Sequence, residues 1–140
     1  MRTRAISRCA TVVAAIGTLA GCAQAVAATA EGRLTGVTQI TYGCPGPQRI
    51  GQQCERWLPF AHARFAVTRT RADGRPITGT RRVVLSDSGG RFNLVLIAGT
   101  YTIVPLPQQH TQGGSTLTIR IRPGQTTHTT IRFLGYPMMA

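Results

Sequence analysis

Residues 86–103 have the sequence SDSGGRFNLVLIAGTYTI, in which two turn signals enclose one alternating apolar segment. Serine, aspartate and glycine at 86–90 are typical of a turn, and Ala98-Gly99 is a second turn signal. Between the turns, every second residue is apolar, as in a strand with one buried face: Phe92, Leu94 and Leu96. Because Val95 adds an apolar side chain on the other face, we expect a central strand that follows a hairpin connection at 86–90.

The same period-two pattern recurs along the chain, and no segment has the apolar spacing of an amphipathic helix. A change of phase between Leu34 and Val37 predicts a β-bulge near Gly36 in the first strand. We therefore expect an all-β fold, a seven-stranded antiparallel β-sandwich. Its strands are predicted at residues 33–42, 61–70, 81–85, 91–96, 100–104, 117–122 and 126–133.

Two segments carry a resemblance to a known family. Residues 86–92, SDSGGRF, followed by Leu96-Ile97-Ala98-Gly99-Thr100-Tyr101-Thr102-Ile103, resemble the Ser-Asp-x-x-Gly-x-Phe and Leu-x-x-Gly-x-Tyr-x-Ile signature of carboxypeptidase regulatory-like domains. The resemblance implies a prealbumin-like (transthyretin-like) fold, with Phe92 and Tyr101 in a shared core. The turn at 120–125 resembles the family's final hairpin. The whole chain resembles small actinobacterial secreted lipoproteins with one such domain, which indicates a fold and little about activity.

The N-terminal segment resembles a lipoprotein signal peptide. Three arginines precede an apolar run, residues 9–20, that is too short to cross a membrane as a helix. Leu19-Ala20-Gly21-Cys22 then resembles a lipobox, which implies cleavage before Cys22 and a lipid on that cysteine. In the alternative interpretation, ordinary cleavage after Ala27 or Ala30 releases a secreted protein. The expected organisation is a signal peptide at 1–21, a flexible tether at 22–32, the sandwich domain at 33–134 and a C-terminal tail at 135–140.

Cys44 and Cys54 remain once Cys9 and Cys22 are assigned to the leader and the lipid site. An even pair in an exported protein favours a disulfide, here around a loop rich in proline and glycine. Half of a metal site is the alternative, although the spacing matches no common zinc motif. Trp57, close to this loop, is expected either to cap one end of the core or to lie exposed as an anchor for a partner.

The charge of the chain is strongly positive and comes entirely from arginine. Sixteen arginines oppose four acidic residues, for a formal net charge of +12, or +9 without residues 1–21, which hold three of the arginines. Such a domain attracts anionic polymers and lipid head groups in a salt-dependent manner. Alternatively, the arginines are only the solvated face of the sandwich. The candidate anion-binding residues are Arg69, Arg71, Arg81, Arg82, Arg120 and Arg122.

No catalytic or metal-binding pattern is present in the sequence. His62, His110 and His128 are far apart and lack a close His-x-His pair, and we expect neither a metal nor a cofactor. There is no Gly-x-Ser-x-Gly elbow, so we expect no enzyme activity. Aromatic residues do not interleave with the arginines, and nucleic acid is not an expected partner. The sequence predicts a non-catalytic cell-envelope lipoprotein with a structural or protein-interaction role; the alternative is a basic module that binds anionic envelope polymers or head groups.

The lipobox makes a direct prediction about Cys22. The wild-type protein should incorporate labelled palmitate and partition into the detergent phase, because a diacylglyceryl anchor holds a protein at a membrane more stably than one acyl chain. The Cys22→Ala variant should do neither. Equal labelling of the two proteins in exporting cells would contradict lipidation at Cys22.

Overall fold

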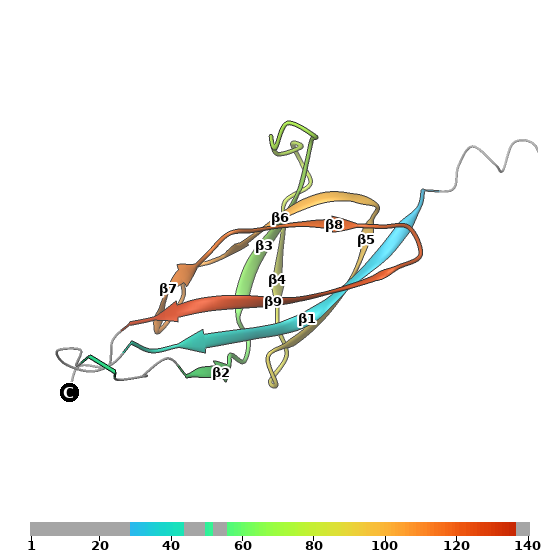
Figure 1. Ribbon diagram of the computed structural model, residues 1–140. Coiled ribbons are helices and arrows are strands. Elements are labelled where there is room, and N and C mark those ends of the chain that lie inside the picture. The colour runs from blue at the N-terminus through green and yellow to red at the C-terminus, as the bar shows by residue number, and fades with distance from the viewer. Residues whose placement is uncertain (1–28, 44–49, 52–55, 137–140) are drawn as a thin grey trace, which may run out of the picture.

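The computed structural model describes residues 29–43, 50–51 and 56–136, which form two packed β-sheets (Figure 1). Cys22, Cys44 and Cys54 lie outside the described residues, so lipidation and the disulfide stay predictions. No helix in the described ranges is long and apolar enough to cross a membrane.

Among the described residues, the β1 sheet contains five strands. Its order is β2 (Trp57–Pro59), β1 (Glu31–Thr41), β9 (Thr126–Gly135) and β7 (Thr111–Gly114), and β5 (Arg91–Ile97) also pairs with β1. The β3 sheet has the order β4 (Arg82–Leu85), β3 (Arg64–Thr70), β6 (Gly99–Pro105) and β8 (Leu117–Ile121).

The β-sandwich predicted from the sequence is confirmed, although its details differ from seven antiparallel strands. Nine strands lie in the described ranges, and two of them, β2 and β7, were not predicted. In addition, β1 pairs with β9 in parallel. β7 lies between the predicted strands at 100–104 and 117–122. Its strand pairing uses Gly114, which lies so close to β9 that a Cβ would collide with the Arg132 carbonyl oxygen. Strand β1 also begins two residues earlier than expected, at Glu31, and β9 continues to Gly135.

The predicted hairpins at 86–90 and 120–125 are wrong, because both turns carry the chain from one sheet to the other. β4 pairs with β3 whereas β5 pairs with β1, and β8 pairs with β6 whereas β9 pairs with β1. The prediction that 91–96 is a central strand is also wrong. β5 pairs only with β1 in the described part of the chain, and Val95 is 50% exposed.

The core lies between the sheets and uses the predicted inward residues. Phe92, Leu94 and Leu96 are all buried, and the Phe92 ring packs against Phe65 with a centroid distance of 4.9 Å. The Tyr101 side chain is buried as expected, and its hydroxyl donates a hydrogen bond to the Ile97 carbonyl at 2.7 Å. The largest fully buried apolar side chains are Phe65, Phe133, Leu34, Ile103, Ile121, Ile131 and Val67.

Gly36 explains the break in the apolar pattern of the first strand. The predicted bulge is absent, since β1 stays in continuous register with β5 and β9 across Gly36. Gly36 instead occupies an inward position directly opposite Phe92, and a Cβ there would collide with the Phe92 ring and the Thr129 carbonyl oxygen. The absence of a side chain at Gly36 therefore leaves the space into which the Phe92 ring packs.

This packing predicts a clear difference between core and surface substitutions. Phe92→Ala should lower the free energy of unfolding by about 3–5 kcal/mol, because it empties an aromatic core position. Arg120→Ala, on the exposed face of β8, should change it by no more than about 0.5 kcal/mol. Denaturant melts of the two variants test this. A Phe92→Ala protein with wild-type stability would contradict the core described here.

Candidate binding surface

Strand register gathers most of the arginines at one end of the sandwich. Glu31 at the start of β1 lies opposite Ile97 at the end of β5, and Arg33 lies beside Thr126 at the start of β9. In the other sheet, Thr100 at the start of β6 lies between Thr70 of β3 and Arg120 of β8. The turns at 98 and 122–125 join the two sheets at this same end. We call this region the basic end; its arginines are Arg33, Arg69, Arg71, Arg75, Arg81, Arg82, Arg120 and Arg122.

All six of the predicted anion-binding arginines belong to the basic end. Arg71 begins the turn after β3, in which its N–H donates to the Arg75 carbonyl at 2.8 Å. Arg81 and Arg82 stand exposed where the chain enters β4, and Arg120 and Arg122 are exposed at the end of β8. The structure therefore places these side chains on one end of the domain. Binding by them remains a prediction.

Arg69 differs from the other five because its guanidinium is half-buried. Its Nη2 donates a hydrogen bond to the Ala98 carbonyl at 3.0 Å, and its backbone N–H donates to Thr80 Oγ1 at 3.1 Å. The neighbouring Tyr101 hydroxyl has a pKa raised by burial, which the Arg69 charge partly offsets. Arg69 thus supports the turn between β5 and β6 as well as adding positive charge.

The basic end carries little negative charge. Glu31 and Asp73 are its acidic residues in the described part of the chain. Asp73 lies 3.7 Å from Arg75 Nε, but both side chains are largely exposed, so the pair contributes little to stability. Most of the guanidinium charge at this end is therefore without a carboxylate partner among the described residues.

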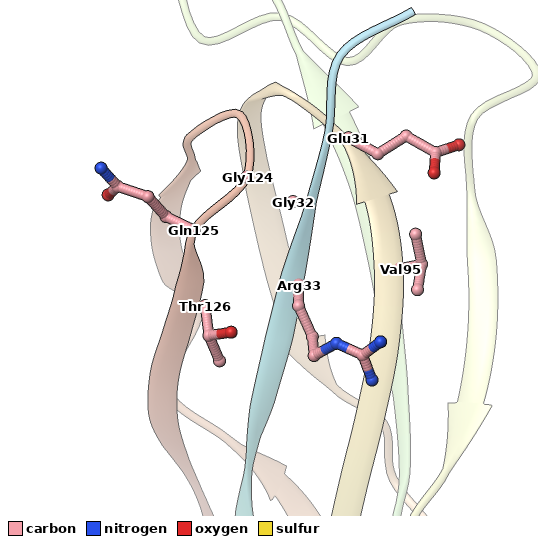
Figure 2. Close-up of a pocket in the computed structure, with 7 residues that line it drawn as sticks. All are labelled: Glu31, Gly32, Arg33, Val95, Gly124, Gln125 and Thr126. Carbon is pink, nitrogen blue, oxygen red and sulfur yellow. The ribbon is translucent and has the colours of Figure 1, made fainter.

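Arg33 is a member of this surface that the sequence analysis did not select. It lines a shallow hollow of about 220 Å³ on the outer face of the β1 sheet, together with Thr126 and Val95 (Figure 2). Figure 2 shows the Glu31 and Arg33 side chains extending across the strand that carries Val95. Arg33 Nη1 donates to Asn93 Oδ1 at 3.1 Å. The sequence did contain a signal for its orientation: Arg33 directly precedes the inward Leu34, so alternation along the strand places its side chain on the outer face.

The opposite end holds the Ser-Asp motif, whose polar atoms serve the fold. Ser86 Oγ accepts a hydrogen bond from the Ala63 N–H at 2.9 Å and lies 3.0 Å from the buried Thr38 Oγ1. Asp87 Oδ1 accepts hydrogen bonds from the N–H groups of Gly89 and Arg91, each at 2.8 Å. The backbone hydrogen bond from Arg91 is the largest of the effects that lower the pKa of Asp87.

The histidines and the tryptophan occupy separate places. His62 and His110 adopt positive φ angles outside the strands, whereas His128 on β9 has its Nδ1 2.7 Å from Thr35 Oγ1. In the described ranges, no three His, Cys, Asp or Glu side chains form a group that could hold a metal ion. The expectation that Trp57 caps the core is wrong. Its ring is only half-buried and lies under the Arg132 guanidinium at 4.8 Å, outside the core cluster.

Comparisons with known proteins agree with this fold. No protein-family model matches the chain, and no curated protein matches it in sequence. GBS52, the minor pilin of Streptococcus agalactiae, is similar in structure with a TM-score of 0.54 and 18% identity over 79% of this chain and 47% of that one. The Bacillus anthracis TIE protein has a TM-score of 0.50 and 15% identity over 76% of this chain and 17% of that one.

These similarities concern the fold alone, because identity is low and the chain spans less than half of either protein. They support the β-sandwich fold. Membership of the carboxypeptidase regulatory-like domains stays a prediction.

The Asp87 contacts predict how stability depends on pH. Because the folded-state pKa of Asp87 is lowered, its contribution is fully present above the pKa of an unfolded aspartate, about 3.9, and is lost as pH falls through the folded value. Asp87→Ala should therefore lower the melting temperature at neutral pH, and its difference from wild type should shrink below about pH 4. Ser88→Ala, in the same exposed turn, is the control. A difference that persists unchanged in acid would contradict the role of the carboxylate.

Proposed function

We propose that this protein is a non-catalytic cell-envelope module on the outer side of the membrane, attached through Cys22, whose basic end binds anionic phosphate groups at the membrane surface. The observation that supports the proposal is the coincidence of two features at one end of the sandwich. The chain enters β1 from its N-terminal side at the same end that carries the arginines.

The length of the connecting segment would keep the basic end near the membrane. Seven residue steps separate Cys22 from Thr29, the first described residue, and an extended chain spans at most about 3.6 Å per residue. A lipid on Cys22 would therefore hold Thr29, two residues before β1, within roughly 25 Å of the bilayer. The short segment lets the arginines reach the bilayer surface. Anionic head groups attract basic side chains that come within about a Debye length, roughly 8–10 Å, and would then orient the domain with its basic end towards the membrane.

Arginine suits this role for chemical reasons. The guanidinium group stays charged and presents paired N–H donors that match phosphate oxygens. Arg71, Arg81, Arg120 and Arg122 are exposed, so they can bind phosphate without unfolding any part of the domain. The available chemistry is thus recognition of charge and geometry, with no bond made or broken.

The test uses protein carrying Cys22→Ala, so that no lipid contributes to attachment. It should bind phosphatidylglycerol vesicles, bind phosphatidylcholine vesicles much more weakly, and lose the difference at high salt. Arg71→Gln and Arg120→Gln should each weaken binding to the anionic vesicles about five-fold, since one basic residue near a surface contributes about 1 kcal/mol. Vesicle sedimentation at several salt concentrations measures this.

Arg64→Gln is the matched control, because Arg64 is exposed at the opposite end of β3 and carries the same charge. It should bind as wild type does. A soluble glycerol-phosphate polymer, used as a competitor, tells whether phosphate in a polymer serves as well as phosphate in a bilayer. Equal loss from Arg64→Gln and Arg120→Gln would refute a localised surface and leave only the net charge of the domain.

A further inference from the structure

We infer that the groove between β4 and β5 binds an extended acidic segment of another polypeptide, which adds a strand to the free edge of β5. This inference goes beyond the proposed function, because its partner is a protein segment and its contacts include the backbone. The groove has a volume of about 280 Å³, and its lining includes Val67, Arg69, Arg82, Val95, Ile97 and Tyr101.

Along this groove, the backbone of β5 has N–H and C=O groups that pair with no other strand in the described ranges. Thr38 N–H donates to the Gly90 carbonyl and Ala98 N–H donates to the Ala30 carbonyl. The even-numbered residues of β5 therefore direct their backbone N–H and C=O groups towards β1. The odd-numbered residues face away, by the alternation of an antiparallel ladder. Asn93 and Val95 thus direct both backbone groups to the free edge.

At the two ends of β5, backbone groups of odd-numbered residues already have hydrogen-bond partners. The Ile97 carbonyl accepts the Tyr101 hydroxyl, and the Arg91 backbone is bonded to Asp87. The open part of the edge therefore runs from Asn93 to the N–H of Ile97. This short ladder suits the addition of one strand, the mode in which backbone hydrogen bonds hold a peptide at a sheet edge.

β4 bounds the groove on the other side and is also an edge strand. Ser86 N–H donates to the Ala63 carbonyl, so by the same alternation Val83 and Leu85 direct their backbone groups away from β3. Both edge strands carry exposed apolar side chains: Val83 41%, Leu85 58%, Val95 50% and Ile97 41%. An exposed apolar edge without proline is what a pairing partner requires and what an unpartnered edge usually avoids.

Charge decides what kind of segment fits. Arg69 lines the groove half-buried and has no carboxylate partner in the described part of the chain, and Arg82 faces the groove because it pairs with the inward Val67. Among the described residues, no acidic side chain lines the groove. In an added strand, alternate side chains would lie beside Val95 and Ile97 on the outer face, while the others point to Arg69 and Arg82. The fitting sequence alternates apolar and acidic residues.

The probe is a blocked peptide of alternating valine and glutamate, added to the Cys22→Ala protein. We expect binding by fluorescence anisotropy, together with slower amide hydrogen exchange at Asn93, Val95 and Ile97. The corresponding valine-lysine peptide should not bind. A peptide N-methylated at alternate residues, on the side that would donate to β5, should bind at least ten-fold more weakly while the protein is unchanged.

Two protein variants locate the site. Val95→Pro removes an N–H at the free edge of β5 without removing a hydrogen bond to β1, and edge strands tolerate proline. This variant should abolish peptide binding. Arg82→Glu should weaken peptide binding at least ten-fold. Arg120→Glu makes the same charge change at the basic end but outside the groove, and should leave peptide binding intact while weakening vesicle binding.

Several results would overturn the inference. These are absence of binding, equal binding of the lysine peptide or the N-methylated peptide, and exchange slowed at another edge. If the β5 amides are protected from hydrogen exchange in the absence of peptide, and this protection grows with protein concentration, the edge pairs with a second copy of the chain. Protection at every concentration would assign it to a segment of the chain itself. The two proposals are tested separately. Loss of vesicle binding with intact peptide binding would contradict only the proposed function, and loss of peptide binding with intact vesicle binding would contradict only this inference.

Discussion

The crossing of the chain between the two sheets at residues 86–92 is the constraint on which the rest of this sandwich depends. The Ser86 hydroxyl is buried and joins Ala63, the residue before β3, to Thr38 of β1 through hydrogen bonds at 2.9 and 3.0 Å. Asp87 then closes the turn, and Gly90 has a φ of +75° at a point where a Cβ would crowd Thr38 and Phe60. Phe92 enters the core directly afterwards. One short segment thus fixes the distance between the sheets and the register of β5 on β1.

This crossing also explains where the charge and the open edges lie. Because the chain changes sheets at 86–90, β4 and β5 are neighbours in sequence that do not pair with each other. Among the strands that the structure describes, each therefore has one edge without a partner, and both edges border the same groove. The later crossings at 98 and 122–125 bring the ends of β5 and β8 to the end where β1 starts. The arginines that flank these strands are gathered there by topology, although they are distant in sequence.

The alternating pattern was sufficient to predict the strands and the buried face but not how the strands pair. Phe92, Leu94 and Leu96 were placed in the core correctly, because side-chain alternation is a local property. A turn of serine, aspartate and glycine, however, looks the same whether it joins paired strands or crosses between sheets. The outcome depends on the distant partners Thr38 and Ala63. The parallel pairing of β1 with β9 is non-local in the same way.

Glycine caused two further failures, since it leaves no side chain for a pattern to detect. Gly36 suggested a bulge but marks the space for Phe92, and Gly114 hid β7 inside a polar segment. For the arginines, alternation predicted the phase of each side chain but not their common end. Arg33 was missed because its neighbours there, Asn93 and Thr126, come from two other strands.

The same reasoning explains the groove. Arg69 and Arg82 are well separated in sequence, and only the β3–β4 pairing places both beside the free edge of β5. An edge bordered by guanidinium groups repels basic chains, including further copies of this one, and leaves acidic strands as the partners it can accept.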